Sequence, residues 1–277
     1  MPTREELEQE FIRHGIDFAN PGFCDTPAFH AAERRSPRLL IKYAQYINAL
    51  NLSPEYLERA RAVVRESAEF LYRELVADGR RGACIDISST MLRFLESQGL
   101  WAYFVGGGLR VQFPARSHIE TKWFWPIMHG DNPALMGHAW VSAPPFKIID
   151  LSFSLQPYTA REQRHLNGFV LIEDCEQPPD QTTLTDLMEP EVRAELRQDF
   201  GRPPRMDDLR EVAPGLLEFM ADFPPCRTTK DGVRLKYIPV RVSAPDLPLE
   251  EMRNLQLRGR YPGQLFEEFQ REINANR

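Results

Sequence analysis

The spacing of apolar residues predicts two helices in the first part of the chain. Residues 3–6 have the pattern of a capping box, so residues 3–14 are predicted to form an amphipathic helix. Ser53 and Pro54 have the order of an N-cap and a first-turn proline, which predicts the start of a longer helix. Its apolar positions follow at intervals of three and four residues: Leu57, Ala60, Val64, Ala68, Leu71 and Leu75. Residues 22–38, between the two helices, are predicted to be irregular.

A third helix and a series of short strands are predicted in the middle of the chain. An apolar stripe at helical spacing begins at Cys84 and ends before Gln98-Gly99, a typical stop signal. Runs of β-branched and aromatic residues then predict strands over residues 101–105, 109–113, 138–142, 146–153 and 169–173. Helices combined with consecutive short strands predict an α+β protein, with the helix at Cys84 packed on an antiparallel sheet.

The sequence changes character after Glu176. Residues 177–180 (Gln-Pro-Pro-Asp) are typical of a linker, and helical patterns follow at residues 184–200, at 209–223 and from about Pro262. Alternating apolar residues between the last two helices predict a strand that is interrupted at Pro239: Val233, Leu235, Tyr237, Val240 and Val242.

These patterns divide the chain into three predicted regions. Residues 1–52 form an N-terminal helical extension, residues 53–176 a core, and residues 177–277 a mostly helical C-terminal region. The C-terminal region is expected either as a separate domain or as an extension packed on the core. In the second case its strand can join the core sheet.

Composition narrows the class of protein without identifying it. The chain has 277 residues, of which 42% are hydrophobic and 27% charged, as in ordinary soluble globular proteins. A net charge of -6 argues against nucleic acid or an anionic membrane as the main partner. No apolar run approaches the roughly 18 residues of a membrane span, and the polar N-terminus is unlike a signal peptide. Four scattered cysteines predict free thiols in a reducing cytoplasm.

Candidate chemistry comes from a cysteine, a histidine and a carboxylate that follow one another in matching local structures. Cys84 opens the third helix, His138 lies in a short apolar strand, and Asp150 lies in the next strand. A helix N-terminus and a neighbouring imidazolium both favour a thiolate, which is the nucleophilic form of cysteine. The set therefore predicts acyl transfer by a thiol. No metal or organic cofactor is required, and Cys24, Cys175 and Cys226 do not have the spacing of metal ligands.

The register of the predicted hairpin gives a sharper expectation. A three-residue loop at Ala143, Pro144 and Pro145 would place His138 directly opposite Asp150 on one sheet face. A two-residue loop at the two prolines would place the two side chains on opposite faces. We predict the three-residue loop, because only that register permits a hydrogen bond between the histidine and the aspartate.

The three motifs resemble a known group of enzymes. Gly82-Ala83-Cys84 before a helix, the run from His138 to Val141, and the run from Ile148 to Leu151 are together similar to the core of the transglutaminase-like superfamily of papain-like cysteine enzymes. The resemblance covers roughly residues 80 to 155. It implies Cys84 as nucleophile, His138 as general base and acid, and Asp150 as the group that orients the imidazole. It also implies an amide, peptide or protein substrate, because the family includes transamidases, peptidases and amide hydrolases.

The long segment before His138 is predicted to line the substrate cleft. Residues 114–137 have little periodicity, and loops of this length are often functional. Trp123 and Trp125 from this segment, with Trp140 from the strand that follows, are the predicted substrate-binding residues. His129 in the same segment is a second choice as general base. Asp86 in the first turn of the cysteine helix is interpreted as an acid that complements the helix dipole.

Two other functions remain open. Residues 81–84 and the pair Asp150 and Phe153 also resemble the arylamine N-acetyltransferases, which are acyl-CoA-dependent, although Ser154-Leu155-Gln156-Pro157 replaces their glycine-rich segment. The second is a binding protein that keeps the fold but has a catalytically silent site. This is allowed because the chain lacks the glutamine that papain-type enzymes place before the cysteine as the second oxyanion donor.

Overall fold

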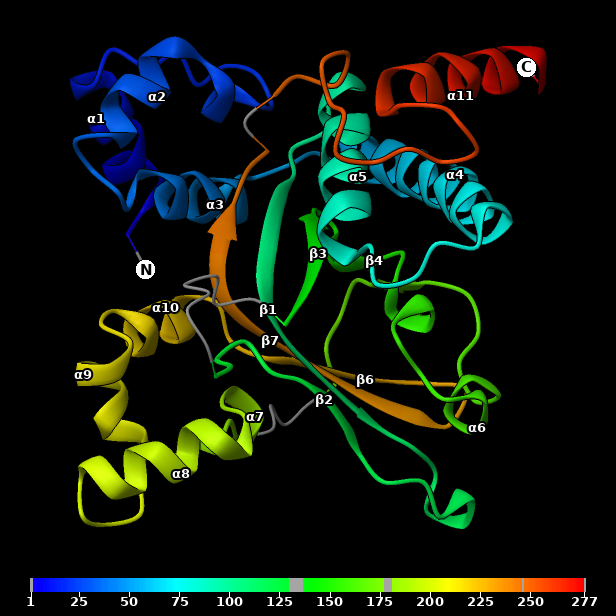
Figure 1. Cartoon of the computed structure of the whole chain (residues 1–277). Coiled ribbons are helices and arrows are strands. Elements are labelled where there is room, and N and C mark those ends of the chain that lie inside the picture. Colours follow the sequence, from blue (N-terminus) through cyan, green and yellow to red (C-terminus); the bar gives the residue numbers. More distant parts are fainter. Residues whose placement is uncertain (1, 130–136, 177–180, 246, 277) are drawn as a thin grey trace.

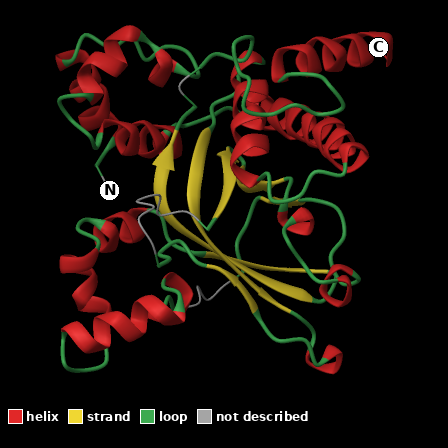
Figure 2. Cartoon of the chain, in the orientation of Figure 1, coloured by secondary structure: helices red, strands yellow, loops and turns green. Residues whose placement is uncertain are grey.

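The computed structural model describes residues 2–129, 137–176, 181–245 and 247–276 (Figure 1). The predicted linker at residues 177–180 lies outside these ranges, as does most of the second half of the predicted cleft segment. The described chain is an α+β protein, in which helices surround one twisted antiparallel sheet (Figure 2). Among the described residues, no helix combines the length and apolar character needed to cross a membrane.

The seven strands of the sheet have the order β5-β4-β3-β1-β7-β6, and β2 pairs with part of β1. Every pairing between these strands is antiparallel. The strands are β1 (Tyr103–Gln112), β2 (Lys122–Phe124), β3 (His138–Ala143), β4 (Phe146–Asp150), β5 (Val170–Ile172), β6 (Cys226–Lys230) and β7 (Val233–Ser243). Strand β6 had no counterpart in the sequence prediction.

The helices gather into groups around this sheet (Figure 1). They are α1 (Arg4–Arg13), α2 (Pro27–Glu33), α3 (Leu39–Ala49), α4 (Pro54–Asp78), α5 (Cys84–Ser97), α6 (Ala160–Gln163), α7 (Leu184–Leu187), α8 (Pro190–Asp199), α9 (Leu209–Val212), α10 (Leu216–Asp222) and α11 (Pro262–Asn276). The caps predicted for the first two helices are confirmed, because the side chains of Thr3 and Ser53 accept hydrogen bonds from first-turn amides. Helix α5 begins at Cys84, as predicted.

Three secondary-structure predictions were wrong for local reasons. Residues 22–38 contain α2, whose N-cap is Thr26 and whose first residue is Pro27, a start signal that the prediction missed. The helix predicted at 184–200 is divided into α7 and α8, because a proline begins α8. The helix predicted at 209–223 is also divided, into α9 and α10. The division lies before Gly215, which adopts a positive φ of 84°.

The two strands predicted at residues 101–113 form one continuous strand, β1. Gly106, Gly107 and Gly108 lie between the two predicted strands. In the structure, a Cβ on Gly107 would lie 2.1 Å from the carbonyl oxygen of Ile238, and one on Gly108 would lie 2.8 Å from Pro126. The glycines therefore permit close packing within a central strand, which is a recognised use of glycine in sheets.

The two edges of the sheet are joined to each other. Cys175, just after β5, forms a disulfide with Cys226, the first residue of β6. The amide of Glu176 also donates a 2.8 Å hydrogen bond to the carbonyl oxygen of Arg227. The sheet therefore curls, and its concave face encloses apolar side chains of β1, β4 and β7. The prediction that these two cysteines are free thiols was wrong, and it was the basis for expecting a reducing cytoplasm.

The N-terminal and C-terminal regions both contact the core. Strand β7 pairs with β1 along almost its whole length, so the C-terminal region contributes a central strand of the sheet. The N-terminal helices are tied to α5 through Arg93, whose guanidinium lies 2.5 Å from the Asp25 carboxylate and 2.6 Å from that of Glu96.

The hairpin between β3 and β4 reaches the predicted orientation by a different route. Ala143 pairs with Phe146, so the loop has two residues, and the predicted three-residue loop was wrong. Further along, Val141 pairs with Ile149, which means that β4 contains one extra residue. This bulge changes the parity of the pairing, and it returns His138 and Asp150 to the same face.

Candidate functional site

Cys84 is held at the N-terminus of α5, beside the start of β3. Ala83 precedes it without a side-chain cap, so the first amides of the helix are not occupied by a capping side chain. One turn later, the Ser88 hydroxyl donates a 3.2 Å hydrogen bond to the carbonyl oxygen of Ala139. This bond fixes the first turn of α5 next to His138, the first residue of β3.

His138 and Asp150 form a hydrogen-bonded pair inside the protein. The distance from His138 Nε2 to Asp150 Oδ2 is 2.6 Å, and both side chains are fully buried. An ionised aspartate accepts only, so Nε2 must carry the proton of this bond. The second ring nitrogen, Nδ1, is left for another partner, and it makes no well-formed hydrogen bond to any described residue.

The Asp150 carboxylate has further donors that the sequence prediction missed. The backbone amide and the hydroxyl of Ser152 donate to Oδ1 over 2.9 and 3.1 Å. The Tyr237 hydroxyl donates to Oδ2 over 3.0 Å. Burial, followed by the nearby Asp150 charge, raises the pKa of Tyr237 well above its ordinary value, so the phenol stays protonated and remains a donor. These bonds hold a buried charge that would otherwise be costly to place away from water.

The imidazole is set up to carry a positive charge. Burial alone would lower the pKa of His138, but the charge and hydrogen bond of Asp150 oppose it, with a smaller contribution from the Cys84 thiol. The result is a pKa raised to about 10. Cys84 itself remains 8% exposed. A cation beside a cysteine sulfur stabilises the thiolate in general.

Helix α5 covers the sheet face that Ala139 and Val141 line, whereas His138 and Trp140 project to the other face. Cys84 and His138 are the first residues of α5 and β3, so the two side chains can meet only at the end where both elements begin. A substrate acyl group that reaches Cys84 would also lie near the uncapped first-turn amides of α5.

The predicted substrate-binding tryptophans occupy two different environments. Trp140 is 1% exposed, and its ring packs between those of His138 and Tyr237 at centroid distances of 6.3 and 5.2 Å. It is therefore part of the packing around the imidazole. Trp123 and Trp125 stack on each other at 5.9 Å and lie half-buried.

The residue between those tryptophans, Phe124, contacts the imidazole instead. Its ring lies 6.1 Å from that of His138, and the alternation along β2 sends the tryptophans to the other side. Trp125 Nε1 donates to the carbonyl oxygen of Thr185 over 2.8 Å. Trp123 and Trp125 thus pack toward α7 and away from His138.

The Asp86 carboxylate has two partners. Arg80 lies 3.6 Å from one carboxylate oxygen, and Asn254 donates to the other over 3.1 Å. The arginine offsets the charge that would otherwise oppose a thiolate two residues earlier. Ile85, between Cys84 and Asp86, is 46% exposed, which is unusual for an isoleucine in a helix.

His129, the second-choice base, lies away from this pair. Its Nδ1 is 2.9 Å from Glu195, and its side chain is 60% exposed. No group of three or more metal-ligating side chains is gathered anywhere in the described ranges. The chain matches no protein-family model, and it has no significant match among the curated proteins or the solved structures.

Proposed function

We propose that this protein transfers acyl groups through a thioester on Cys84. The observation that carries the proposal is the buried pair of His138 and Asp150 next to the first residue of α5. Asp150 binds Nε2 at 2.6 Å, and the Cys84 thiol adds to the rise in the pKa of the ring. A nucleophile beside a base, with the base oriented by a third group, is the general arrangement for covalent catalysis.

The reaction follows from the roles of these groups. The Cys84 thiolate attacks the acyl carbon, and the first-turn amides of α5 stabilise the oxyanion that develops. When the tetrahedral intermediate collapses, imidazolium gives its proton to the leaving amine and a thioester forms. Water or an amine then attacks the thioester and loses a proton to His138. The C–S bond breaks, which releases the acyl product and regenerates the thiolate and the imidazolium.

The proposed substrate is an amide, peptide or protein, and the proposed fold family is the transglutaminase-like group. The α+β architecture and the cysteine at a helix start support this assignment. The curled sheet and the histidine and aspartate on adjacent strands are also compatible with it. Asp150 fixes the tautomer of His138, and no cofactor is needed for either half of the reaction.

A catalytically silent binding protein is the second candidate, and one observation favours it. His138 is fully buried and Cys84 is almost so, which leaves little room for a substrate in this conformation. The acetyl-CoA-dependent alternative has no comparable support among the described residues.

An activated ester distinguishes these candidates without knowledge of the natural substrate. We expect p-nitrophenyl acetate to release nitrophenol in a burst of one equivalent and to acetylate Cys84, detected by peptide mass spectrometry. Cys84→Ala should show no burst, whereas Cys24→Ala, the matched control, should show a normal one. Absence of an adduct on Cys84 at millimolar donor would favour the silent protein. Accumulation of the adduct from acetyl-CoA as well would support the acetyltransferase.

A further inference from the structure

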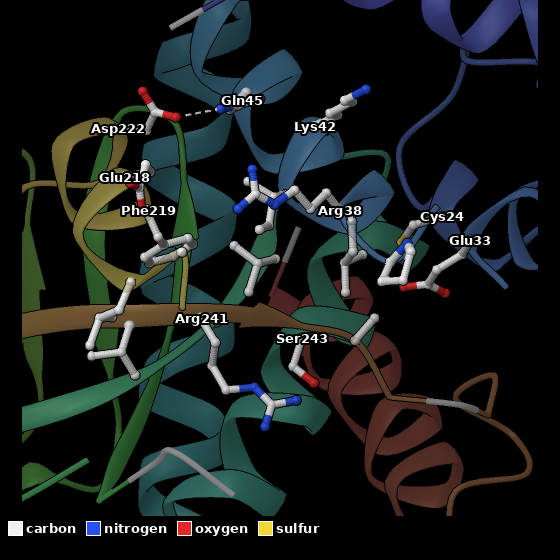
Figure 3. A pocket seen from close by; sticks show the side chains of 18 of the residues that line it. Cys24, Glu33, Arg38, Lys42, Gln45, Glu218, Phe219, Asp222, Arg241 and Ser243 are labelled. Atoms are coloured by element: carbon white, nitrogen blue, oxygen red, sulfur yellow. Dashed lines mark hydrogen bonds between the residues drawn. The ribbon is translucent and has the colours of Figure 1, made fainter. Parts of the chain in front are cut away.

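A cavity that Cys84 does not line is located between α3, α10 and the second half of β7 (Figure 3). It has a volume of about 1130 Å³ and is open to solvent on one side. We call it the edge groove. Residues 240–243 of β7 form its floor, Arg38 and Lys42 come from the α3 side, and Phe219 comes from α10. None of these residues takes part in the site around His138.

The floor of the edge groove is an unpaired strand edge. Strand β6 pairs with β7 only as far as Tyr237, opposite Cys226. From Ile238 to Ser243, β7 pairs with β1 on one side. On its outer side, residues 240–243 form no backbone hydrogen bond to any part of the chain that the structure describes. Ile238 is buried and Pro239 has no N–H, so the open part of the edge begins at Val240. Such an edge is a template for an added strand, and proteins usually cover or charge edges that are not used.

The charges around the edge groove are not balanced. Lys42 is paired with Glu10 at 2.6 Å, and Glu218 with Arg210 at 3.1 Å. The other charged groups on the lining are the guanidinium groups of Arg34, Arg38 and Arg241 and the carboxylates of Glu33 and Asp222, and Asp222 accepts a 2.7 Å hydrogen bond from Gln45. The groove thus has an excess of positive charge, although the chain carries a net charge of -6.

Arg38 and Arg241 lie on different sides of the strand edge. In Figure 3, Arg38 reaches from the start of α3 over the cavity, and Arg241 projects from β7 itself. A chain lying along the edge would therefore meet a guanidinium from each side. Alternate side chains of an extended strand point to opposite faces, so acidic residues on either face can be reached.

We propose that the edge groove binds an acidic peptide segment in extended conformation, as an additional strand on residues 240–243 of β7. Backbone hydrogen bonds to the free edge supply affinity, and the arginines select acidic side chains, as in other cases of strand addition. A small anion would use the arginines and leave the strand edge unpaired. A second copy pairing β7 with β7 would bring the Arg241 groups of the two chains together, which like-charge repulsion opposes.

A designed peptide tests this inference by fluorescence anisotropy. The probe is a fluorescein-labelled octapeptide that alternates glutamate and threonine. One control has lysine in place of glutamate. A second control has the acidic sequence with alternate amides N-methylated, which keeps the charge and removes the donors of one edge. We expect the acidic peptide alone to bind, and the lysine and N-methylated peptides to bind at least about 10-fold more weakly.

Variants of the protein locate the binding site. Arg38→Glu and Arg241→Glu should each weaken binding of the acidic peptide by about 10-fold, because each removes a charged contact and adds repulsion. Arg35→Glu is the matched control and should bind normally, since Arg35 does not line the groove. Cys84→Ala should also bind normally, because the groove is separate from the candidate active site.

Three results would overturn the proposal. One is equal binding of the N-methylated and unmodified acidic peptides, which would indicate attraction of charge without strand addition. Another is failure of the acidic peptide to bind at millimolar concentration, in a sample whose melting temperature shows that the protein is folded. The third is a dimer in sedimentation analysis that Arg241→Glu strengthens, which would assign the edge to a second copy of the chain.

Discussion

At the residue scale, the site depends on how the Asp150 carboxylate is held. The order of Cys84, His138 and Asp150 along the chain predicted the histidine–aspartate pair from the sequence. Tyr237 was not predictable, because its hydroxyl reaches Asp150 from 87 residues away on a strand that only the tertiary fold brings near. The bond from Ser152 could have been predicted, since a serine two residues after an aspartate often donates back to it.

Removal of the Tyr237 hydroxyl should weaken this hold without breaking it. Tyr237→Phe keeps the ring that packs against Trp140 and leaves Asp150 with its bonds to His138 and Ser152. We expect a loss of about 1–3 kcal/mol in the free energy of unfolding, because the lost bond is to a charged acceptor. Urea denaturation measures this loss, and an NMR titration reports the pKa of His138 in the same variant. A variant as stable as the parent would show that the tyrosine does not support Asp150.

At the element scale, the hairpin shows why parity could not be derived from sequence alone. The two prolines suggested an odd loop, and the structure instead combines an even loop with a bulge in β4. Both routes place His138 and Asp150 on one face. Loop length and bulge compensate each other, and a bulge has no strong signal in a sequence without glycine at that position. The glycines of β1 lie inside a continuous strand, not between two strands. They are needed there because Ile238 and Pro126 pack closely against them.

The contact between α5 and β3 provides a test at this scale. Ser88→Ala removes the hydroxyl that anchors the first turn of α5 to Ala139. We expect a cost of about 1 kcal/mol and a slower reaction of Cys84 with iodoacetamide, because the thiol is held less firmly beside the imidazole. Ser97→Ala, an exposed position at the end of the same helix, is the control and should change neither quantity. Equal effects of the two substitutions would contradict this role.

At the scale of the whole molecule, the closure of the sheet and the attachment of both terminal regions are tertiary features. Nothing in the spacing of Cys175 and Cys226 predicted that the two sheet edges meet, since the disulfide spans 51 residues. Of the N-terminal helices, α1 was predicted, whereas α2 and α3 were not. Their connection to α5 through Arg93 was not predictable either, because the contacts of a buried arginine have no local pattern.

Loss of the disulfide should destabilise the protein. The double substitution Cys175→Ser with Cys226→Ser removes the cross-link that restricts the unfolded chain. We therefore expect a loss of about 2–4 kcal/mol in the free energy of unfolding. The loss is measured by urea unfolding under non-oxidising conditions, beside the oxidised parent. The parent with reductant should resemble the double variant. If reductant leaves the stability of the parent unchanged, the bond does not form in solution.

The cluster that ties the N-terminal helices to α5 should make stability depend on pH. Burial, partly offset by Arg93, raises the pKa of Glu96 from 4.5 to about 7. The folded state then binds the proton more tightly, so this stabilisation is complete below about pH 4.5 and is lost as the pH rises through 7. The difference between the pKa of Glu96 in the folded and the unfolded state corresponds to at most about 3 kcal/mol of unfolding free energy.

The sign of this dependence can be isolated with two variants. Glu96→Gln should remove the fall in unfolding free energy between pH 4.5 and 7, measured by urea denaturation at each pH. Glu10, whose hydrogen bond to Lys42 lowers its pKa, contributes with the opposite sign, so Glu10→Gln should leave that fall in place. A fall that persists in Glu96→Gln would exclude Glu96 as its source.

The most direct test of a nucleophilic Cys84 is its rate of alkylation by iodoacetamide, measured by peptide mass spectrometry between pH 5 and 10. Imidazolium at His138 persists until about pH 10. We therefore expect Cys84 in the parent to react at pH 6 at least about 10-fold faster than a free thiol. His138→Gln should lose this advantage, and Cys24, fully buried beside Tyr43, should stay unmodified. A Cys84 that reacts no faster than a free thiol at pH 6, with or without His138, would contradict the proposed function.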